Sequence, residues 1–365
     1  MRRRGRRAIL ALGLVACGGG APPVIGFAYD IPDSGAVAVA RASLPGSLAP
    51  SFALAHGRRS GAAGAVESAA QLIAIPGVVA VVGPAESRSV LLTASMFDEA
   101  GIVRIAPTST SRLLRGHPWT LLLAPDDSLE AEFIARFVAE SLSVRTVAIF
   151  YGNDEYGAGL LDALKVAMTG RGITLTNQVP AEESCAPSGA AAAAHGVPAA
   201  GPPGAVIIAT NHAVDAACIA RFVLARVPAM RFIAGDGLDL TDRNFRAAAG
   251  SAAHAFFTVA FWHAGVATAA SRRFVDQFQR LMGRAPLPQD ALSYDALMLL
   301  AHAVRVAGPG RAAVRGYLLT LGASAPAYQG VTGPIAFAGS AAHTMYMLHL
   351  LQDSTVSITS SPPAP

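Results

Sequence analysis

Residues 81–114 read VVGPAESRSVLLTASMFDEAGIVRIAPTSTSRLL, and this stretch decides the fold class. An apolar run ends at a Gly-Pro pair, a helical pattern covers residues 88–100, and a second apolar run ends at Pro107. Near-continuous apolar strands joined by a helix are typical of a parallel sheet covered on both faces. Four hydroxyl residues follow the second run: Thr108, Ser109, Thr110 and Ser111. Such a run shapes a turn, and it also supplies donors to a ligand.

The same alternation of apolar runs and helical patterns continues on both sides of this stretch. Runs such as VIGFAY and SFALAH come before it, and TVAIFYG, AVIIATN and RFIAGDG come after it. Two such series in a chain of 365 residues predict an α/β protein with two doubly wound parallel-sheet lobes. Further helical patterns and two strand-like runs, GPIAF and MYMLHLL, close the chain. Residues 182–204, rich in Ala, Pro and Gly, predict a long surface loop.

The N-terminus has the anatomy of an export signal. Five arginines in the first seven residues precede a short apolar stretch, residues 8–16, which cannot cross a bilayer as a helix. Cys17 follows, at the place where a bacterial lipoprotein signal has its lipidated cysteine. We expect residues 1–23 to be a signal peptide and tether, with Cys17 lipidated and the remainder soluble, periplasmic or at the cell surface. A plain secretory signal with an incidental cysteine is the alternative.

Charge and cysteine content narrow the function further. The formal net charge is +4, but the chain without its five N-terminal arginines carries −1, which is no signature of nucleic-acid binding. In an oxidising compartment Cys185 and Cys218 are able to form a disulfide. Two buried thiols without a bond are the alternative, and the sequence leaves both open.

Motifs for catalysis and metal binding are missing from the sequence. It contains no G-x-S-x-G elbow, no phosphate loop, no H-E-x-x-H and no C-x-x-C, and its nine histidines have no paired-ligand spacing. We therefore expect neither a metal nor a cofactor, and a hydrolase is the least favoured class.

Polar residues gather where the predicted strands end. In open α/β sheets, ligands bind beyond the carboxyl ends of the strands. Hydroxyls beside a helix start suit an anion, an acid suits a cation, and a ring suits an apolar group. Together these groups complement a zwitterionic amino acid, although a serine there is also a common N-cap and Asp-Gly a common turn. These positions, narrowed by a resemblance to a known family, give the candidates Ala85, Glu86, Ser87, Thr108, Thr110, Tyr156, Asn211 and Asp236.

Three stretches resemble one known family, the periplasmic binding proteins (leucine-binding, type I class) of ABC importers for branched-chain amino acids. Residues 81–114 follow the family's order of strand, Gly-x-x-x-Ser, helix, strand and hydroxyl loop. IFYGNDEYGAGLLDAL (149–164) is similar to its Tyr-Gly helix start, and VTGPIAF (331–337) resembles its C-terminal Gly-Pro motif. The resemblance, over about residues 24–353, implies a hinge-closing protein that binds a small amino-acid-like ligand without covalent chemistry. The implied partner is an ABC permease in the inner membrane.

The resemblance also implies roles for individual residues. Ser87 and Thr110 match residues whose hydroxyls hold the ligand's carboxylate and amine, and Thr108 matches one that contributes through its backbone. Tyr156 matches the aromatic that covers the ligand from the second lobe. Asp236 stands where the family has a carboxylate that pairs with the ligand's ammonium.

The sequence departs from the family around the expected pocket. The loop after the first strand, residues 30–35, is short and has no aromatic. Glu86 stands where a neutral residue is expected, and Asn211 replaces an aromatic. These departures favour a polar or basic ligand over leucine. They also keep a second function open, a regulatory or sensory lipoprotein of the same fold whose degenerate cleft binds a protein partner.

The expected lobes are discontinuous, because the chain crosses between them three times. We expect an N-terminal lobe of residues 24–123 and 262–332, and a C-terminal lobe of residues 124–261 and 333–353. A disordered tail is expected at residues 354–365. A ligand favours closure of such lobes because the second lobe adds contacts only in the closed state.

Overall fold

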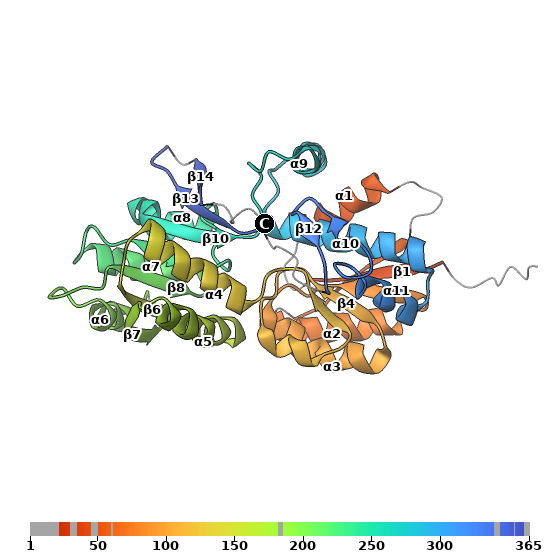
Figure 1. Cartoon of the computed structure of the whole chain (residues 1–365), viewed down its shortest axis with the longest axis horizontal. Helices are drawn as coiled ribbons and strands as arrows, with labels where there is room; N and C mark the ends of the chain where they lie inside the picture. The colour runs from red at the N-terminus through yellow and green to blue at the C-terminus, as the bar shows by residue number, and fades with distance from the viewer. Residues whose placement is uncertain are drawn as a thin grey trace, which may run out of the picture.

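The computed structural model describes residues 22–29, 35–44, 50–59, 61–181, 185–338, 344–353 and 355–360. These residues form two α/β lobes side by side, the first on the right and the second on the left in Figure 1. Of the expected signal peptide and tether, only residues 22 and 23 are described, so Cys17 lies outside the described residues. Among the described helices, none is both long enough and apolar enough to cross a bilayer.

The first lobe is built on a five-stranded parallel sheet in the order β2-β1-β3-β4-β5. β1 pairs with both β2 and β3, so the sheet grows in opposite directions from that point. Such a reversal opens a crevice beyond the carboxyl ends of the two strands concerned. The elements of this part of the lobe are β1 (Val24–Tyr29), α1 (Gly35–Ser43), β2 (Ser51–His56), α2 (Gly61–Ala74), β3 (Val78–Val82), α3 (Ser87–Ala100), β4 (Val103–Ala106), η1 (Arg112–Gly116) and β5 (Thr120–Leu122).

A later segment of the chain completes the first lobe. The long helix α10 packs against α1, β1 and β3, and α11 packs against β3 and β4. This segment comprises α9 (Ala269–Met282), α10 (Pro288–Ala307), α11 (Arg311–Leu318), β11 (Tyr328–Gln329) and β12 (Pro334–Ile335).

The second lobe holds a seven-stranded sheet in the order β14-β13-β10-β9-β8-β6-β7. The strands from β10 to β7 are parallel, and β13 and β14 add an antiparallel edge. Its elements are α4 (Asp127–Arg136), the π-helical turn η2 (Phe137–Ser141), β6 (Thr146–Tyr151), α5 (Glu155–Gly170), β7 (Thr174–Pro180), α6 (Pro187–Gly196), β8 (Ala205–Ala209), α7 (Ala213–Leu224), β9 (Phe232–Ala234), α8 (Arg243–Ala249), η3 (Gly250–Ala255), β10 (Phe256–Ala260), β13 (Tyr346–Leu350) and β14 (Val356–Ser360).

The two doubly wound parallel sheets confirm the predicted fold class. The apolar runs VVAVV and AVIIA form β3 and β8, and every residue in both strands is buried. Burial on both faces explains why these runs are continuously apolar rather than alternating. Polar residues follow the carboxyl end of each strand, where the chain leaves the buried sheet.

Two expectations about loops are wrong. The region expected to be a loop contains α6, because its alanine run has high helix propensity and Pro187 occupies the first turn, where proline is tolerated. The region expected to be a disordered tail contains β14, whose β-branched residues pair with β13. Residues 361–365 of that tail lie outside the described residues.

Within the second lobe, Cys185 and Cys218 form a disulfide that ties the start of the α6 region to α7, with their Cα atoms 5.2 Å apart.

The border between the lobes near the C-terminus differs from the expected one. The hairpin of β11 and β12 keeps the chain with the first lobe past residue 332, the expected border. The amides of Phe337 and Ala338 then bond to the carbonyl of Leu321, so the return to the second lobe comes later still.

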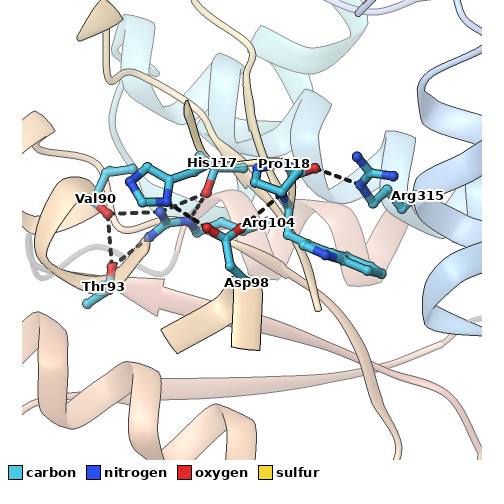
Figure 2. A network of polar contacts seen from close by, with 9 residues as sticks. Val90, Thr93, Asp98, Arg104, His117, Pro118 and Arg315 are labelled. Carbon is cyan, nitrogen blue, oxygen red and sulfur yellow. Dashed lines mark hydrogen bonds and ion pairs between the residues drawn. The ribbon is translucent and has the colours of Figure 1, made fainter. Parts of the chain in front are cut away.

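A fully buried arginine fastens β4 to its neighbours in the first lobe (Figure 2). The guanidinium of Arg104 donates to the Val90 carbonyl (2.8 Å) and to the Thr93 hydroxyl (2.6 Å) on α3, and to the Thr120 hydroxyl (2.9 Å) on β5. It also lies over the ring of Phe97, 4.9 Å from its centroid. Burial lowers the pKa of Arg104 to about 9, so the group stays charged at neutral pH. This charge is satisfied by neutral oxygens, and it holds α3 on the strand that leads to the hydroxyl run.

Candidate functional site

A cavity of about 620 Å³ lies between the two lobes. The first lobe lines it with residues that follow β1, β3 and β4, which is the crevice created by the reversal of strand order at β1. The second lobe lines it with residues that follow β6, β8 and β9. The carboxyl ends of parallel strands thus form part of both walls, as the sequence predicts for a ligand site, and residues from the loop before α10 and from its first turns add to the lining.

The wall from the first lobe is the start of α3 and the turn after β4. Glu86, not Ser87, occupies the N-cap position, and its side chain makes no capping hydrogen bond to the helix. The Ser87 hydroxyl lies in the first turn and is 3.0 Å from that of Ser109. The first amides of a helix have no partner within it and form the positive end of its dipole. This wall therefore presents hydroxyls and amides that suit an anionic group.

The turn after β4 is fastened to the loop that follows β3. The Thr108 hydroxyl donates to the Ala85 carbonyl at 3.0 Å. Gly83 has a φ of +87°, and a Cβ there would lie 2.1 Å from the carbonyl oxygen of Ala28. Only glycine thus allows the end of β3 to pass so close to the end of β1. This close approach places the start of α3 at the cavity.

The wall from the second lobe carries an aromatic ring and an acid. Tyr156, in the first turn of α5, is buried, and its hydroxyl accepts a hydrogen bond from the Gly237 amide at 3.1 Å. Asp236 follows β9 and lines the cavity beside Asn211, which follows β8. A Cβ at Gly235 would lie 2.4 Å from the Tyr156 hydroxyl oxygen, so a larger residue there would push the acid and the ring apart.

Two more acids lie behind Asp236, in the first turn of α4. Glu130 is fully buried, and its Oε1 accepts a hydrogen bond from the Asp236 amide at 2.8 Å. Burial raises the pKa of Asp236 to about 6 and that of Asp127 to about 7. Burial, and then the negative charge of Asp236, raises the pKa of Glu130 well above its usual range. Desolvation disfavours the charged form of each acid, so the second lobe concentrates carboxyl groups that bind protons near neutral pH.

Seven of the eight ligand-binding candidates from the sequence line this one cavity. They are Ala85, Glu86, Ser87, Thr108, Tyr156, Asn211 and Asp236. Thr110 is different, since it is buried and does not line the cavity. Its carbonyl accepts a hydrogen bond from the Asp127 amide at 2.9 Å, which joins the hydroxyl run to the start of α4.

Four residues of the site region were not among the ligand-binding candidates from the sequence. His212 and His263 line the cavity, and burial lowers the pKa of His263, which keeps its ring neutral. Asp127 and Glu130 were hidden in an ordinary signal, because acids are common in the first turn of any helix. Across the part of the chain that the structure describes, no three His, Cys, Asp or Glu side chains are grouped so as to hold a metal ion.

The family model of periplasmic binding proteins matches residues 59–355, which is most of the chain. The chain belongs to this family. Its members bind solutes rather than catalyse reactions, and the family places this binding protein outside the cytoplasm.

Curated relatives are similar over a shorter stretch. The Leu/Ile/Val-binding protein BraC3 of Rhizobium johnstonii is 33% identical over 109 residues, which are 29% of this chain and 30% of that protein. The Leu/Ile/Val-binding protein homolog 3 of Brucella melitensis is 31% identical over 109 residues, again 30% of its length. The chain thus matches less than a third of the length of these relatives.

Solved structures of similar fold cover almost the whole binding protein. The leucine-binding protein LivK of Thermotoga maritima has a TM-score of 0.81 at 20% identity, covering 93% of this chain and 98% of that one. LivJ of Streptococcus pneumoniae, solved with isoleucine, has a TM-score of 0.77 at 18% identity, covering 94% and 99%. A solute-binding protein of R. palustris, solved with benzoate, has a TM-score of 0.77 at 16% identity, covering 94% and 98%. At these identities the similarity shows the fold alone.

Proposed function

We propose that this protein captures an amino acid between its two lobes and delivers it to an ABC importer. One observation carries the proposal: the two walls of a single cavity are chemically complementary to a zwitterion. The first lobe offers hydroxyls and a helix N-terminus, and the second offers the Asp236 carboxylate beside the Tyr156 ring. The names of the relatives, which bind Leu, Ile or Val, support the same class of ligand.

The proposed orientation of the ligand follows from this division. The carboxylate lies against Ser87, Thr108 and the first turn of α3, and the ammonium lies against Asp236. A hydrogen bond to a charged group is worth roughly 1.5–3 kcal/mol, about twice a neutral one. The ammonium contact is therefore the stronger anchor. In this scheme Thr110 acts only indirectly, by joining the turn after β4 to α4.

The rest of the cavity favours a ligand with a polar or basic side chain. Glu86, Asn211 and Asp239 all line it, and no lysine or arginine does so among the described residues. A lining that contains several acids and no lysine or arginine attracts positive charge and repels negative charge. We therefore expect basic and polar amino acids to bind more tightly than leucine, and acidic ones least.

The proposed delivery route is a permease in the inner membrane that recognises the closed lobes. We propose that Cys17 is lipidated and holds the protein at the membrane surface, which limits its search for the permease to two dimensions.

Calorimetric titration of the mature protein against the twenty amino acids and benzoate tests the proposal. We expect heat of binding with at least one amino acid and none with benzoate, which has no ammonium group to pair with Asp236. Absence of heat with every amino acid, or binding of benzoate alone, would contradict it.

A further inference from the structure

The acid behind the ligand-binding carboxylate is the least expected feature of the cavity. Glu130 reaches the loop after β9 from α4, with its Oε1 bonded to the Asp236 amide (2.8 Å), and does not itself line the cavity. Its Oε2 and the Asp236 Oδ1 are both buried without a hydrogen-bond partner among the described residues. A Cβ at Gly235 would lie only 2.8 Å from Glu130 Oε1. Glu130 thus packs against the backbone that carries Asp236, and each acid acts on the pKa of the other.

Among the described residues, no cation is one of the groups that shift the pKa of Glu130 or of Asp236. The groups that face Glu130 are Asp236 from the loop after β9, Tyr156 from α5, and Asp127 from α4. Asp126, the N-cap of α4, is paired with Arg115, and Arg112 acts on Asp127. Two buried carboxylates side by side cannot both be charged without a large cost, so one proton between them is the favourable state.

We propose that Glu130 and Asp236 hold one shared proton in the ligand-free protein, and that a ligand's ammonium group displaces this proton to solvent on binding. This proposal rests on the proposed function, in which Asp236 faces the ammonium. It makes Glu130 a positioning residue that determines specificity, because only a cationic group can replace the positive charge that leaves.

The exchange balances in charge. Before binding, the pair has one proton and a net charge of −1, with the neutral acid donating a hydrogen bond to the carboxylate. After binding, the ammonium supplies the positive charge, both carboxyl groups are ionised, and the proton passes to buffer. Hydrogen bonding by the side chains of Tyr156 and Glu130 limits the rise in the pKa of Asp236, which favours placing the proton on Glu130. Affinity therefore rises with pH, by up to about tenfold per pH unit when a full proton is released.

Calorimetry in buffers of different ionisation enthalpy measures this proton directly. L-arginine and L-leucine serve as ammonium-bearing probes, and 4-methylpentanoate is the matched probe without an amine. At pH 6.5, we expect the apparent enthalpy of amino-acid binding to change with buffer as a release of up to one proton requires. Binding of an amino acid with the same apparent enthalpy in every buffer would overturn the inference and leave the proposed function intact.

Glu130→Gln is the decisive variant, because its amide keeps an acceptor for the Asp236 amide and a donor for the Asp236 carboxylate but carries no proton to lose. We expect the variant to bind the same probe with little dependence on buffer and pH. Glu140→Gln, exposed on η2, is the matched control and should release protons as the wild type does. Proton release from Glu130→Gln equal to that of the wild type would overturn the role of Glu130.

A second measurement needs no ligand. The pKa of Glu130 in the folded protein is raised above its ordinary value, so its contribution to stability is fully present below that ordinary value and is lost as pH rises through the folded one. The melting temperature of the wild type should therefore fall relative to Glu130→Gln between pH 5 and 8. Parallel curves would overturn the inference even if no probe binds, and failure of all probes alone would contradict only the proposed function. If the variant does not fold, the wild type's buffer dependence alone decides the proposal.

Discussion

Both lobes bury charge, but they treat it in opposite ways. In the first lobe, the buried Arg104 donates hydrogen bonds to two threonine hydroxyls and a carbonyl, and it does not line the cavity. In the second lobe, Glu130 and Asp236 each retain a buried oxygen without a hydrogen-bond partner among the described residues. A buried charge whose hydrogen bonds are made within the protein supports the fold. We infer that a buried charge with an oxygen left without a hydrogen bond, close to a cavity, serves ligand binding.

The comparison predicts that the same kind of substitution has opposite effects in the two lobes. Removal of a satisfied charge should destabilise the protein, since it leaves buried oxygens without donors. Removal of an unsatisfied charge should leave the fold intact and damage binding.

Arg104→Met should lower the free energy of unfolding by about 3 kcal/mol, because it removes several charged hydrogen bonds and the contact with Phe97. Denaturation of the ligand-free protein in urea measures this effect. Arg280→Met, on the exposed side of α9, is the matched control and should change stability by less than about 0.5 kcal/mol. An Arg104 variant as stable as this control would show that the network does not support the fold.

Asp236→Asn should weaken binding of an amino acid by about 10- to 100-fold, since it removes a charged hydrogen bond worth roughly 1.5–3 kcal/mol. The unfolding free energy at pH 7.5 should stay the same or rise, because the buried carboxylate is itself destabilising above its pKa of about 6. Calorimetry and denaturation of the same variant check both parts. Asp276→Asn, exposed on α9, is the control. Unchanged affinity in Asp236→Asn would refute the assigned anchor.

Ser87→Ala should weaken binding by about three- to tenfold, the effect of one neutral hydrogen bond. The substitution also deprives the Ser109 hydroxyl of its partner at 3.0 Å, so a small loss of stability is expected. Ser95→Ala, exposed on the same helix, is the control. A larger loss of ligand affinity in Ser87→Ala than in Asp236→Asn would show that the first lobe, not the second, is the stronger anchor for the ligand.

The sequence was sufficient for the parts of the protein whose chemistry is local. Buried parallel strands need continuous apolar runs, and ligands bind at their carboxyl ends, so Ser87, Tyr156 and Asp236 were expected at this edge from their positions. Their individual roles came from the family resemblance. The prediction of a loop around α6 was wrong because the segment mixes two signals. Its alanines favour a helix, and they stand among prolines and glycines that favour turns.

Residues whose role depends on packing between distant segments were out of reach. Glu130 is 106 residues from Asp236, and nothing in its own helix pattern indicates that contact. Arg104 lies within an apolar run, and only the fold brings Thr93 and Thr120 to it. The inward or outward direction of Thr110 is set by a turn whose backbone angles the sequence leaves undetermined.

The central claim is that the first lobe holds the anionic end of the ligand and the second lobe the cationic end. A crystal structure of the complex with the tightest-binding amino acid tests it most directly. We predict the ammonium nitrogen within about 3 Å of an Asp236 carboxylate oxygen, and the ligand carboxylate against Ser87 and the first turn of α3. A ligand bound in the reverse orientation, or one that leaves Asp236 without contact, would contradict the account.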